Sequence, residues 1–291
     1  MKTAFLVNPS ARWKPHLKSL ISEIENRFLG EKEIFLVDRS QPDSTEKHLG
    51  RIARGEFTRI VVAGGDGTLN RTINFLKKQN ISDKFSLGII PFGTCNDFAR
   101  FLRLKAGRVR SALRVIARGH EQTVCVARVN DCYFINNAGF GKKNPAEIKS
   151  PAQVIREMQV SHVSAVWDDK SFIGDCFMML CANAPYFSSG LHFSRKSDPS
   201  DDLLEFFFVR KMTRARLFFK LLVGRARIPL HFLPNRSIVR VETKKMTVYS
   251  DRPVAIVVDG ESVPGLSRTR EAVFETAGTV RFVVRPETFT G

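Results

Sequence analysis

The chain has 291 residues, a hydrophobic fraction of 43% and a formal net charge of +17. Its length predicts one large domain or two modest ones, and its charge predicts an anionic partner: a nucleic acid, an anionic membrane surface or a polyphosphate. Apolar runs stay well short of the roughly 18 residues that a membrane-spanning helix needs, which argues against an integral membrane protein.

The five cysteines are odd in number and form no CxxC pair. This usage is typical of small buried hydrophobic residues in a reducing compartment. The N-terminal sequence turns polar after seven residues, which is too early for a signal peptide. We therefore expect a cytoplasmic protein whose membrane contact is peripheral, at the inner face of the membrane.

Strands and helices alternate through the first third of the sequence. Apolar runs predict strands at 3–7, 33–37, 59–63 and 86–91. Helical spacing is found over 13–28 and 44–53 and again from Leu69 to Leu76. This alternation predicts an α/β fold with a mostly parallel sheet and helices on both of its faces.

The pattern changes after about residue 122, where strand-like segments follow one another with few helices between them. These segments are 123–137, 172–182, 203–210, 237–249, 254–259 and 278–285. We therefore expect an α/β domain over 1–122 and an antiparallel, β-rich domain of the sandwich kind over 123–279.

The run VVAGGDGTLN joins the third strand to the following helix. Gly64, Gly65 and Gly67 allow positive φ and leave no Cβ in the way, so that backbone N–H groups can converge on phosphate oxygens. Asp66 would be a poor neighbour for phosphate without a cation, so its position predicts Mg²⁺. The alternative is a plain glycine turn with an aspartate cap.

A second run, PFGTCNDFAR at 91–100, also leaves a strand and enters a helix. It offers a glycine, the Thr94 hydroxyl, the Asn96 amide and the Asp97 carboxylate. Carboxyl ends of parallel strands share one edge of a sheet, so the two runs are expected to meet there. Neither the Walker A pattern nor the Rossmann GxGxxG is present.

GGDGTLN at 64–70 and P-x-GTxNDFAR at 91–100 resemble the soluble bacterial diacylglycerol kinases and related lipid kinases, a group akin to the sphingosine kinases. VDGE at 258–261 and Asn8-Pro9 after the first strand occur in the matching order. The resemblance extends over nearly the whole chain. It implies an α/β domain and a β-rich domain, with ATP between them and residues 280–291 returning to the first domain.

The resemblance also implies roles for individual residues. Asp66 and Asp97 would organise Mg²⁺ through water, and Glu261 would take the proton from the lipid hydroxyl. This set of catalytic residues suits phosphoryl transfer, which needs positioning, charge neutralisation and a base. The ATP-binding residues would be Asn8, Gly64, Gly65, Asp66, Gly67, Thr68, Leu69, Asn70, Arg71, Gly93, Thr94 and Asn96.

SDPSDDLLE at 197–205 is similar to a metal-binding segment of the family. The metal ligands would be Asp198, Asp201 and Leu203, the outer two through their backbone carbonyls. Oxygen ligands suit Mg²⁺ or Ca²⁺. The family has glycine where this chain has Asp202, so the turn is expected to differ.

Several supporting residues depart from the family pattern. Arg71 replaces a glutamate, Cys125 replaces an aspartate, and Ser40 is the nearest hydroxyl to an expected threonine. Lys142 and Lys143 either form a solvated pair or mark a more anionic acceptor headgroup. These departures leave two hypotheses open: an active lipid kinase, or a weakened relative that binds nucleotide or anionic lipid.

Residues 206–241 contain nine Arg or Lys and no acidic residue. Within them, 213–227 has the composition of an interfacial helix on anionic lipid, with a helix packed on its own domain as the alternative. The positive charge would also suit a nucleic-acid partner, but the sequence contains no recognisable nucleic-acid-binding motif. Diacylglycerol or a similar lipid is the expected substrate, and the sequence leaves open whether the protein is a homodimer.

Overall fold

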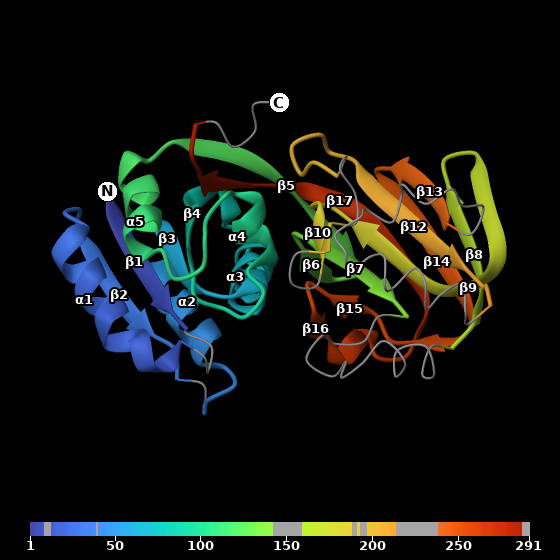
Figure 1. Cartoon of the computed structure of the whole chain (residues 1–291), viewed down its shortest axis with the longest axis horizontal. Helices are drawn as coiled ribbons and strands as arrows, with labels where there is room; N and C mark the ends of the chain where they lie inside the picture. Colours follow the sequence, from blue (N-terminus) through green and yellow to red (C-terminus); the bar gives the residue numbers. More distant parts are fainter. Residues whose placement is uncertain are drawn as a thin grey trace. The chain divides into compact units, whose positions relative to one another are not determined.

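The computed structural model divides the chain into two compact units, Met1–Val124 with Thr279–Gly291 and Cys125–Gly278 (Figure 1). The structure describes residues 1–8, 13–38, 40–141, 159–187, 191–192, 197–213 and 238–286. Lys142 and Lys143 lie outside these ranges, and so does the predicted membrane helix at 213–227 apart from Thr213.

The first unit is built on a parallel sheet in the order β2-β1-β3-β4-β17. Its strands are β1 (Lys2–Val7), β2 (Lys32–Leu36), β3 (Phe57–Gly64), β4 (Ser86–Pro91) and the end of β17 (Thr269–Val283). β3 and β4 pair with Val62 opposite Ile89 and are buried along almost their whole length, as strands covered on both faces are. The expected parallel α/β fold is confirmed.

Helices cover both faces of this sheet. They are α1 (Leu17–Arg27), α2 (Ser44–Arg54), α3 (Asp66–Lys78), α4 (Asp97–Phe101) and α5 (Val109–Arg118), with short 3-10 turns at Lys14–His16 and Ser82–Lys84. α1 and α5 bury Leu20, Ile24 and Leu113 against alternate residues of β1, β3 and β4. α2 and α3 pack on each other and on β1 and β3.

The second unit is an antiparallel β structure, as expected. Two strands are shared with the first unit: β5 (Glu121–Val129) belongs to the second unit from residue 125 on, and β17 belongs to it up to residue 278. The other strands are β6 (Cys132–Phe134), β7 (Asn137–Phe140), β8 (Ser161–Trp167), β9 (Lys170–Ala182), β10 (Tyr186–Phe187), β11 (Leu191–His192), β12 (Leu204–Arg210), β13 (Ile238–Thr243), β14 (Lys245–Val254), β15 (Val257–Val258) and β16 (Glu261–Ser262). The main path runs β16-β15-β7-β9-β8-β14-β17, and β12 joins β9 to β13.

The predicted single strand at 123–137 is wrong, because the chain reverses at Asn130 and Asp131. Asn130 has a left-handed φ of 49°, and Val129 pairs with Cys132 across the turn. The segment is therefore a β5–β6 hairpin followed by the start of β7. The helix predicted from Leu69 also begins earlier, at Asp66, with Gly65 as its N-cap residue.

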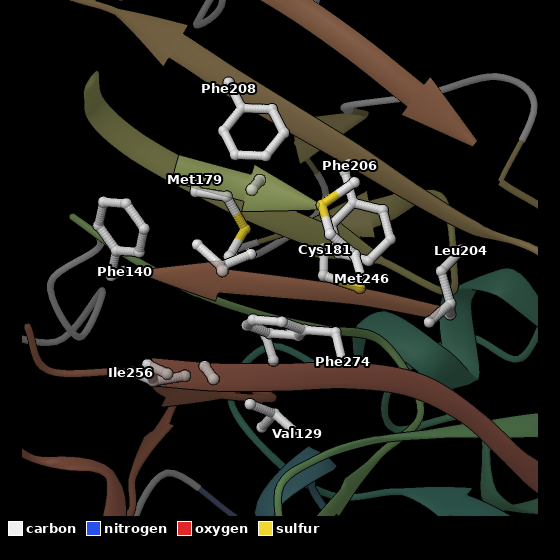
Figure 2. Close-up of a cluster of buried hydrophobic side chains, with 14 of the residues drawn as sticks. Val129, Phe140, Met179, Cys181, Leu204, Phe206, Phe208, Met246, Ile256 and Phe274 are labelled. Carbon is white, nitrogen blue, oxygen red and sulfur yellow. The ribbon is translucent and has the colours of Figure 1, made fainter. Parts of the chain in front are cut away.

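Phenylalanines fill the core of the second unit (Figure 2). Phe206 and Phe274 meet edge to face with ring centroids 5.9 Å apart, and Phe208 stacks on Phe172 at 4.5 Å. Burial of each such ring contributes roughly 1.5–3 kcal/mol. All of Leu204–Val209 is buried, because β12 is paired on both edges and packed on both faces. In the described part of the chain, no helix has the length and apolar character needed to cross a bilayer.

Candidate functional site

The carboxyl ends of β3 and β4 bring the two glycine-containing runs into contact. The Phe92 N–H donates to the Gly64 carbonyl at 2.9 Å, and Gly65 then lies directly against Gly93. A Cβ added to Gly93 would lie 2.2 Å from the Gly65 Cα, which no real Cβ tolerates. Glycine at both positions is therefore required by the close approach of two backbones.

Positive φ, which the sequence suggested for the GGDG glycines, is not used there. Gly65 has φ −106° in an extended conformation, and Gly67 lies within α3. Positive-φ glycines in the described residues are found at other positions, such as Gly107 and Gly119. Helix α3 starts directly at the motif, so its N-terminus, the end that favours negative charge, lies at the edge of the sheet.

Asp66 ties the second run to the first. Its Oδ2 accepts the backbone N–H of Asp97 at 3.1 Å, and its Oδ1 accepts that of Phe98 at 3.2 Å. The Asp66 carboxylate therefore caps the N-terminus of α4, where negative charge is favourable. The structure brings the Asp66 carboxylate to the backbone of Asp97, the second aspartate that the sequence predicted to act with it, and Asp97 is buried at 6% exposure.

Asn96 fixes the turn that contains Gly93. It adopts the left-handed conformation, with φ 54° and ψ 45°, which asparagine tolerates better than most residues. Its Oδ1 accepts the Gly93 N–H at 2.9 Å and its Nδ2 donates to the Gly93 carbonyl at 2.8 Å. Thr94, between them, is exposed.

Trp13 supports the same turn, and the sequence analysis missed it. Its indole Nε1–H donates to the Gly93 carbonyl at 3.1 Å, and its ring packs on Phe92 with centroids 5.0 Å apart. Gly107 allows the indole to approach, because a Cβ there would lie 2.7 Å from it. No local pattern points to this contact, which joins residues 80 positions apart.

Asn8 and Thr68 complete the group in the first unit. The Asn8 Nδ2 donates to the Thr68 Oγ1 at 2.9 Å. The Asn8 Oδ1 is buried and accepts no hydrogen bond within the described ranges. A buried oxygen of this kind is costly unless a ligand donates to it, so this atom is suited to a donor group of a bound molecule. Arg71, one turn into α3, is exposed.

Glu261 lies in the second unit, as the first residue of β16, directly after a hairpin turn. Val258 and Glu261 pair across a two-residue turn, in which Asp259 has φ 47° and Gly260 φ 87°. Two successive left-handed residues are the pattern that Asp-Gly hairpin turns favour. The turn leaves the Glu261 side chain open to solvent.

Asp259 anchors that hairpin, a role the sequence analysis did not assign. Its carboxylate accepts three backbone N–H groups, from Ile135 at 3.0 Å, Asn136 at 2.9 Å and Asn137 at 3.0 Å. Asp259 itself is 8% exposed, and its N–H donates to the Asn137 carbonyl at 2.8 Å. In the VDGE run, the aspartate therefore holds the turn in place, whereas the glutamate is exposed.

The predicted metal segment forms a compact turn. The Asp201 N–H donates to the Asp198 carbonyl at 3.2 Å, and the Asp201 Oδ1 accepts the Leu203 N–H at 3.0 Å. Partial burial, together with the neighbouring Asp198 and Glu242 carboxylates, raises the pKa of Asp201. Among the described residues, no three His, Cys, Asp or Glu side chains are grouped as metal ligands. A cation here would depend on backbone carbonyls.

Two departures from the family pattern lie side by side. Asp202, at the position of the family glycine, takes a left-handed conformation with φ 56°, which aspartate tolerates better than most residues. The Cys125 thiol lies 3.8 Å from the Asp202 Oδ1, and the Asp202 Oδ2 pairs with Lys244 at 2.6 Å. Burial raises the pKa of Cys125, whereas the hydrogen bond from Lys244 lowers the pKa of Asp202. A carboxylate, that of Asp202, thus lies beside the thiol at position 125.

Comparison with known proteins gives a consistent result. Residues 2–129 match the family model of the diacylglycerol kinase catalytic domain. A diacylglycerol kinase of Staphylococcus epidermidis is 34% identical over 146 residues, which are 45% of each chain, and one of Bacillus subtilis is 24% identical over 222 residues, 71% of this chain and 72% of that one.

A solved structure of a Bacillus anthracis str. Sterne protein superposes with a TM-score of 0.82 at 23% identity, over 98% of this chain and 97% of that one, and shows that the two share a fold. The sequence match spans less than half the length of the Staphylococcus epidermidis kinase. The resemblance that the two glycine-containing runs suggested is confirmed: residues 2–129 of this chain match the family model of the diacylglycerol kinase catalytic domain, and the relatives named above are diacylglycerol kinases.

Proposed function

We propose that this protein is an ATP-dependent lipid kinase that transfers the γ-phosphate to the hydroxyl of diacylglycerol or a similar lipid. One observation carries the proposal: the Asp66 carboxylate caps α4 while Gly65 packs on Gly93. This contact gathers the N-terminus of α4, the Asp66 carboxylate and the residue Asp97 at one edge of a parallel sheet, where α/β proteins bind nucleotides. The Asn8 Oδ1, which accepts no hydrogen bond from the described residues, adds an acceptor to the group.

The residues present fit a magnesium-bound nucleotide. The Asp66 carboxylate accepts two backbone N–H groups of α4 and carries the negative charge that a hydrated cation would need beside the phosphates. Mg²⁺, entering with ATP as part of the substrate, would neutralise phosphate charge. The first turn of α3 would bind phosphate oxygens through its N–H groups, and Asp97 would help to orient the hydrated ion.

Glu261 is proposed to take the proton from the lipid hydroxyl. Its carboxylate is exposed, and the hairpin beneath it is held by the Asp259 network, so that its position is set by backbone contacts. A general base needs this combination of reach and fixed geometry. The acceptor is proposed to be a membrane lipid met at the inner face of the membrane. Five free cysteines, three of them buried, support a reducing cytoplasmic location.

The alternative is a weakened relative that binds nucleotide or anionic lipid as a sensor. Its support is the neutral thiol of Cys125, whose raised pKa denies the site the charge of a carboxylate at that position. Asp202 argues against this alternative, because its carboxylate, with a lowered pKa, lies beside the thiol.

The deciding experiment measures transfer of labelled γ-phosphate from ATP, with Mg²⁺, to diacylglycerol, monoacylglycerol and ceramide in mixed micelles. Labelled lipid would support the kinase and rank its acceptors. ATP binding without transfer to any acceptor would favour the sensor. Salt-sensitive nucleic-acid binding without ATP binding would contradict both.

A further inference from the structure

The positive charge of this protein is concentrated in two stretches. Residues 98–120 contain seven Arg or Lys and no Asp or Glu, and residues 206–241 contain nine and none. The rest of the chain is almost balanced, with 30 basic and 29 acidic residues. The first stretch lies wholly within the described residues, so the structure shows how its charges are arranged in space.

The basic residues of this first stretch lie on the outside of the first unit. Helix α5 turns Ala112, Leu113, Val115 and Ile116 to the core, which leaves its opposite face to solvent. Arg114 and Arg118, four residues apart, follow one another along that exposed face. We define the α5 basic surface as five exposed residues of α5 and of the loop before it: Arg103, Lys105, Arg108, Arg114 and Arg118.

The α5 basic surface is not neutralised by carboxylates of the described residues. Arg110, on the same helix, shows the contrast: it binds the Glu23 carboxylate with three hydrogen bonds of 3.0–3.1 Å. Within the described part of the chain, none of the five residues of the α5 basic surface forms an ion pair. Because these five exposed charges, which lie within 103–118, have no carboxylate partner among the described residues, they are suited to an anionic partner.

We propose that the α5 basic surface docks on an anionic phospholipid bilayer. Four of its five residues are arginines, whose guanidinium groups bind phosphate oxygens in pairs. A bilayer surface needs charge of the right sign but no shape complementarity. Single-stranded nucleic acid would need exposed aromatic rings for base stacking, and the aromatic residues of 98–120 are Phe98, which is buried, and Phe101, which is half-buried.

The docking rests on the proposed function, because a kinase of membrane lipids gains from residence at the membrane. The binding itself needs no catalysis and can be measured without ATP. Each basic residue near an anionic surface strengthens partitioning by roughly fivefold. Neutralising three of the five should therefore weaken binding about 100-fold. Salt should have a similar effect, since the charges are exposed.

The experiment is co-sedimentation of the full-length protein with vesicles of equal parts phosphatidylglycerol and phosphatidylcholine, and with pure phosphatidylcholine. The variant Arg108→Gln/Arg114→Gln/Arg118→Gln should lose about 100-fold in partitioning to the anionic vesicles and change little on the neutral ones. Replacement of the same three residues by lysine keeps the charge and should restore most of the binding.

The matched control is Lys47→Gln/Arg51→Gln/Arg54→Gln on the exposed face of α2. It removes the same charge from a helix of the same unit, where Lys47 and Arg51 already pair with Asp43 and Glu33. We expect near wild-type binding. Equal losses in the two triple variants would show that only the net charge matters and would overturn the proposal.

Wild-type binding by the α5 variant would also overturn the proposal and would leave residues 206–241 as the candidate for membrane binding.

Circular dichroism melting of each variant checks the fold, which substitutions at exposed positions should leave unchanged. Transfer to a short-chain, water-soluble diacylglycerol should be unaffected by the α5 variant, so a failure of the proposed function would appear there and not in the vesicle assay. Tighter binding to RNA than to anionic vesicles at equal salt would contradict the bilayer as partner.

Discussion

The Asp66 carboxylate accepts the backbone N–H of Asp97 at 3.1 Å, so one catalytic candidate determines where the other stands. The residues lie 31 positions apart and follow neighbouring parallel strands. A carboxylate at this position does two things: it caps α4, and it carries negative charge to the place where a hydrated cation would sit. Substitution of Asp66 must therefore be interpreted with both roles in mind.

Asp66→Asn should abolish phosphoryl transfer while costing only about 1 kcal/mol of stability. The asparagine keeps one oxygen for the α4 N-terminus but turns an NH₂ group toward the second N–H, so one charge-assisted hydrogen bond is lost. Transfer assays and thermal melting would be run on the same preparation. Near wild-type turnover would remove the GGDG run from the active site.

Gly93→Ala should disrupt the site more severely than its size suggests. The new Cβ would lie 2.2 Å from the Gly65 Cα and 2.8 Å from the Asn96 Oδ1, so the two strand ends must separate. We expect loss of measurable ATP binding and about 1–3 kcal/mol of destabilisation. Gly265→Ala is the matched control, because a Cβ added there would meet nothing within 4 Å. Calorimetric ATP titration distinguishes them, and intact binding by the Gly93 variant would refute the contact.

The VDGE run is expected to separate into a structural residue, Asp259, and the proposed general base, Glu261. Asp259→Asn should destabilise the second unit by about 2–3 kcal/mol, because the charged acceptor of three backbone N–H groups is lost, while asparagine still tolerates the left-handed backbone. Glu261→Gln should leave melting unchanged and slow transfer by about 10²- to 10⁴-fold. If Glu261→Gln instead weakened ATP binding with normal turnover, its role would lie with the nucleotide.

The cysteines should differ sharply in reactivity toward iodoacetamide. Burial raises the pKa of Cys176 to about 12 and that of Cys181 well above its ordinary value, so neither forms appreciable thiolate between about pH 7 and 9. The half-buried Cys95 and Cys132 should be alkylated first. MgATP should slow the labelling of Cys95, which lies between Thr94 and Asn96. Peptide mass spectrometry would measure each rate, and fast labelling of Cys181 in the folded protein would contradict its burial.

Asp201 gives a stability test of the predicted metal site. Its pKa is raised in the folded state, so the folded protein holds this proton more tightly, and stability falls as pH rises from the unfolded pKa to the folded one. Asp201→Asn should therefore raise the melting temperature slightly at pH 7 and have no effect below about pH 3.5. Ca²⁺ should stabilise the wild type and not the variant. An identical response of both proteins to Ca²⁺ would rule out a ligand role for Asp201.

Local patterns that the sequence analysis passed over were present in two elements. The spacing of Ala112, Leu113 and Ile116, with Gly119 after them, is that of an amphipathic helix with a left-handed C-cap, and the structure has α5 there. Strand β8 alternates buried Val163 and Ala165 with less buried neighbours. Both elements were accessible from the sequence.

The sequence by itself determined the parallel sheet, the antiparallel second unit and the two glycine-containing runs, because side-chain periodicity and turn residues act over a few neighbouring positions. Tertiary structure alone decided which backbone groups those residues serve. Asp66 reaches α4 across 31 positions, and Asp259 reaches Asn137 across 122. Such contacts depend on the register of strands remote in sequence, and that register is set by the packing of the whole sheet and its helices, to which no local pattern gives access.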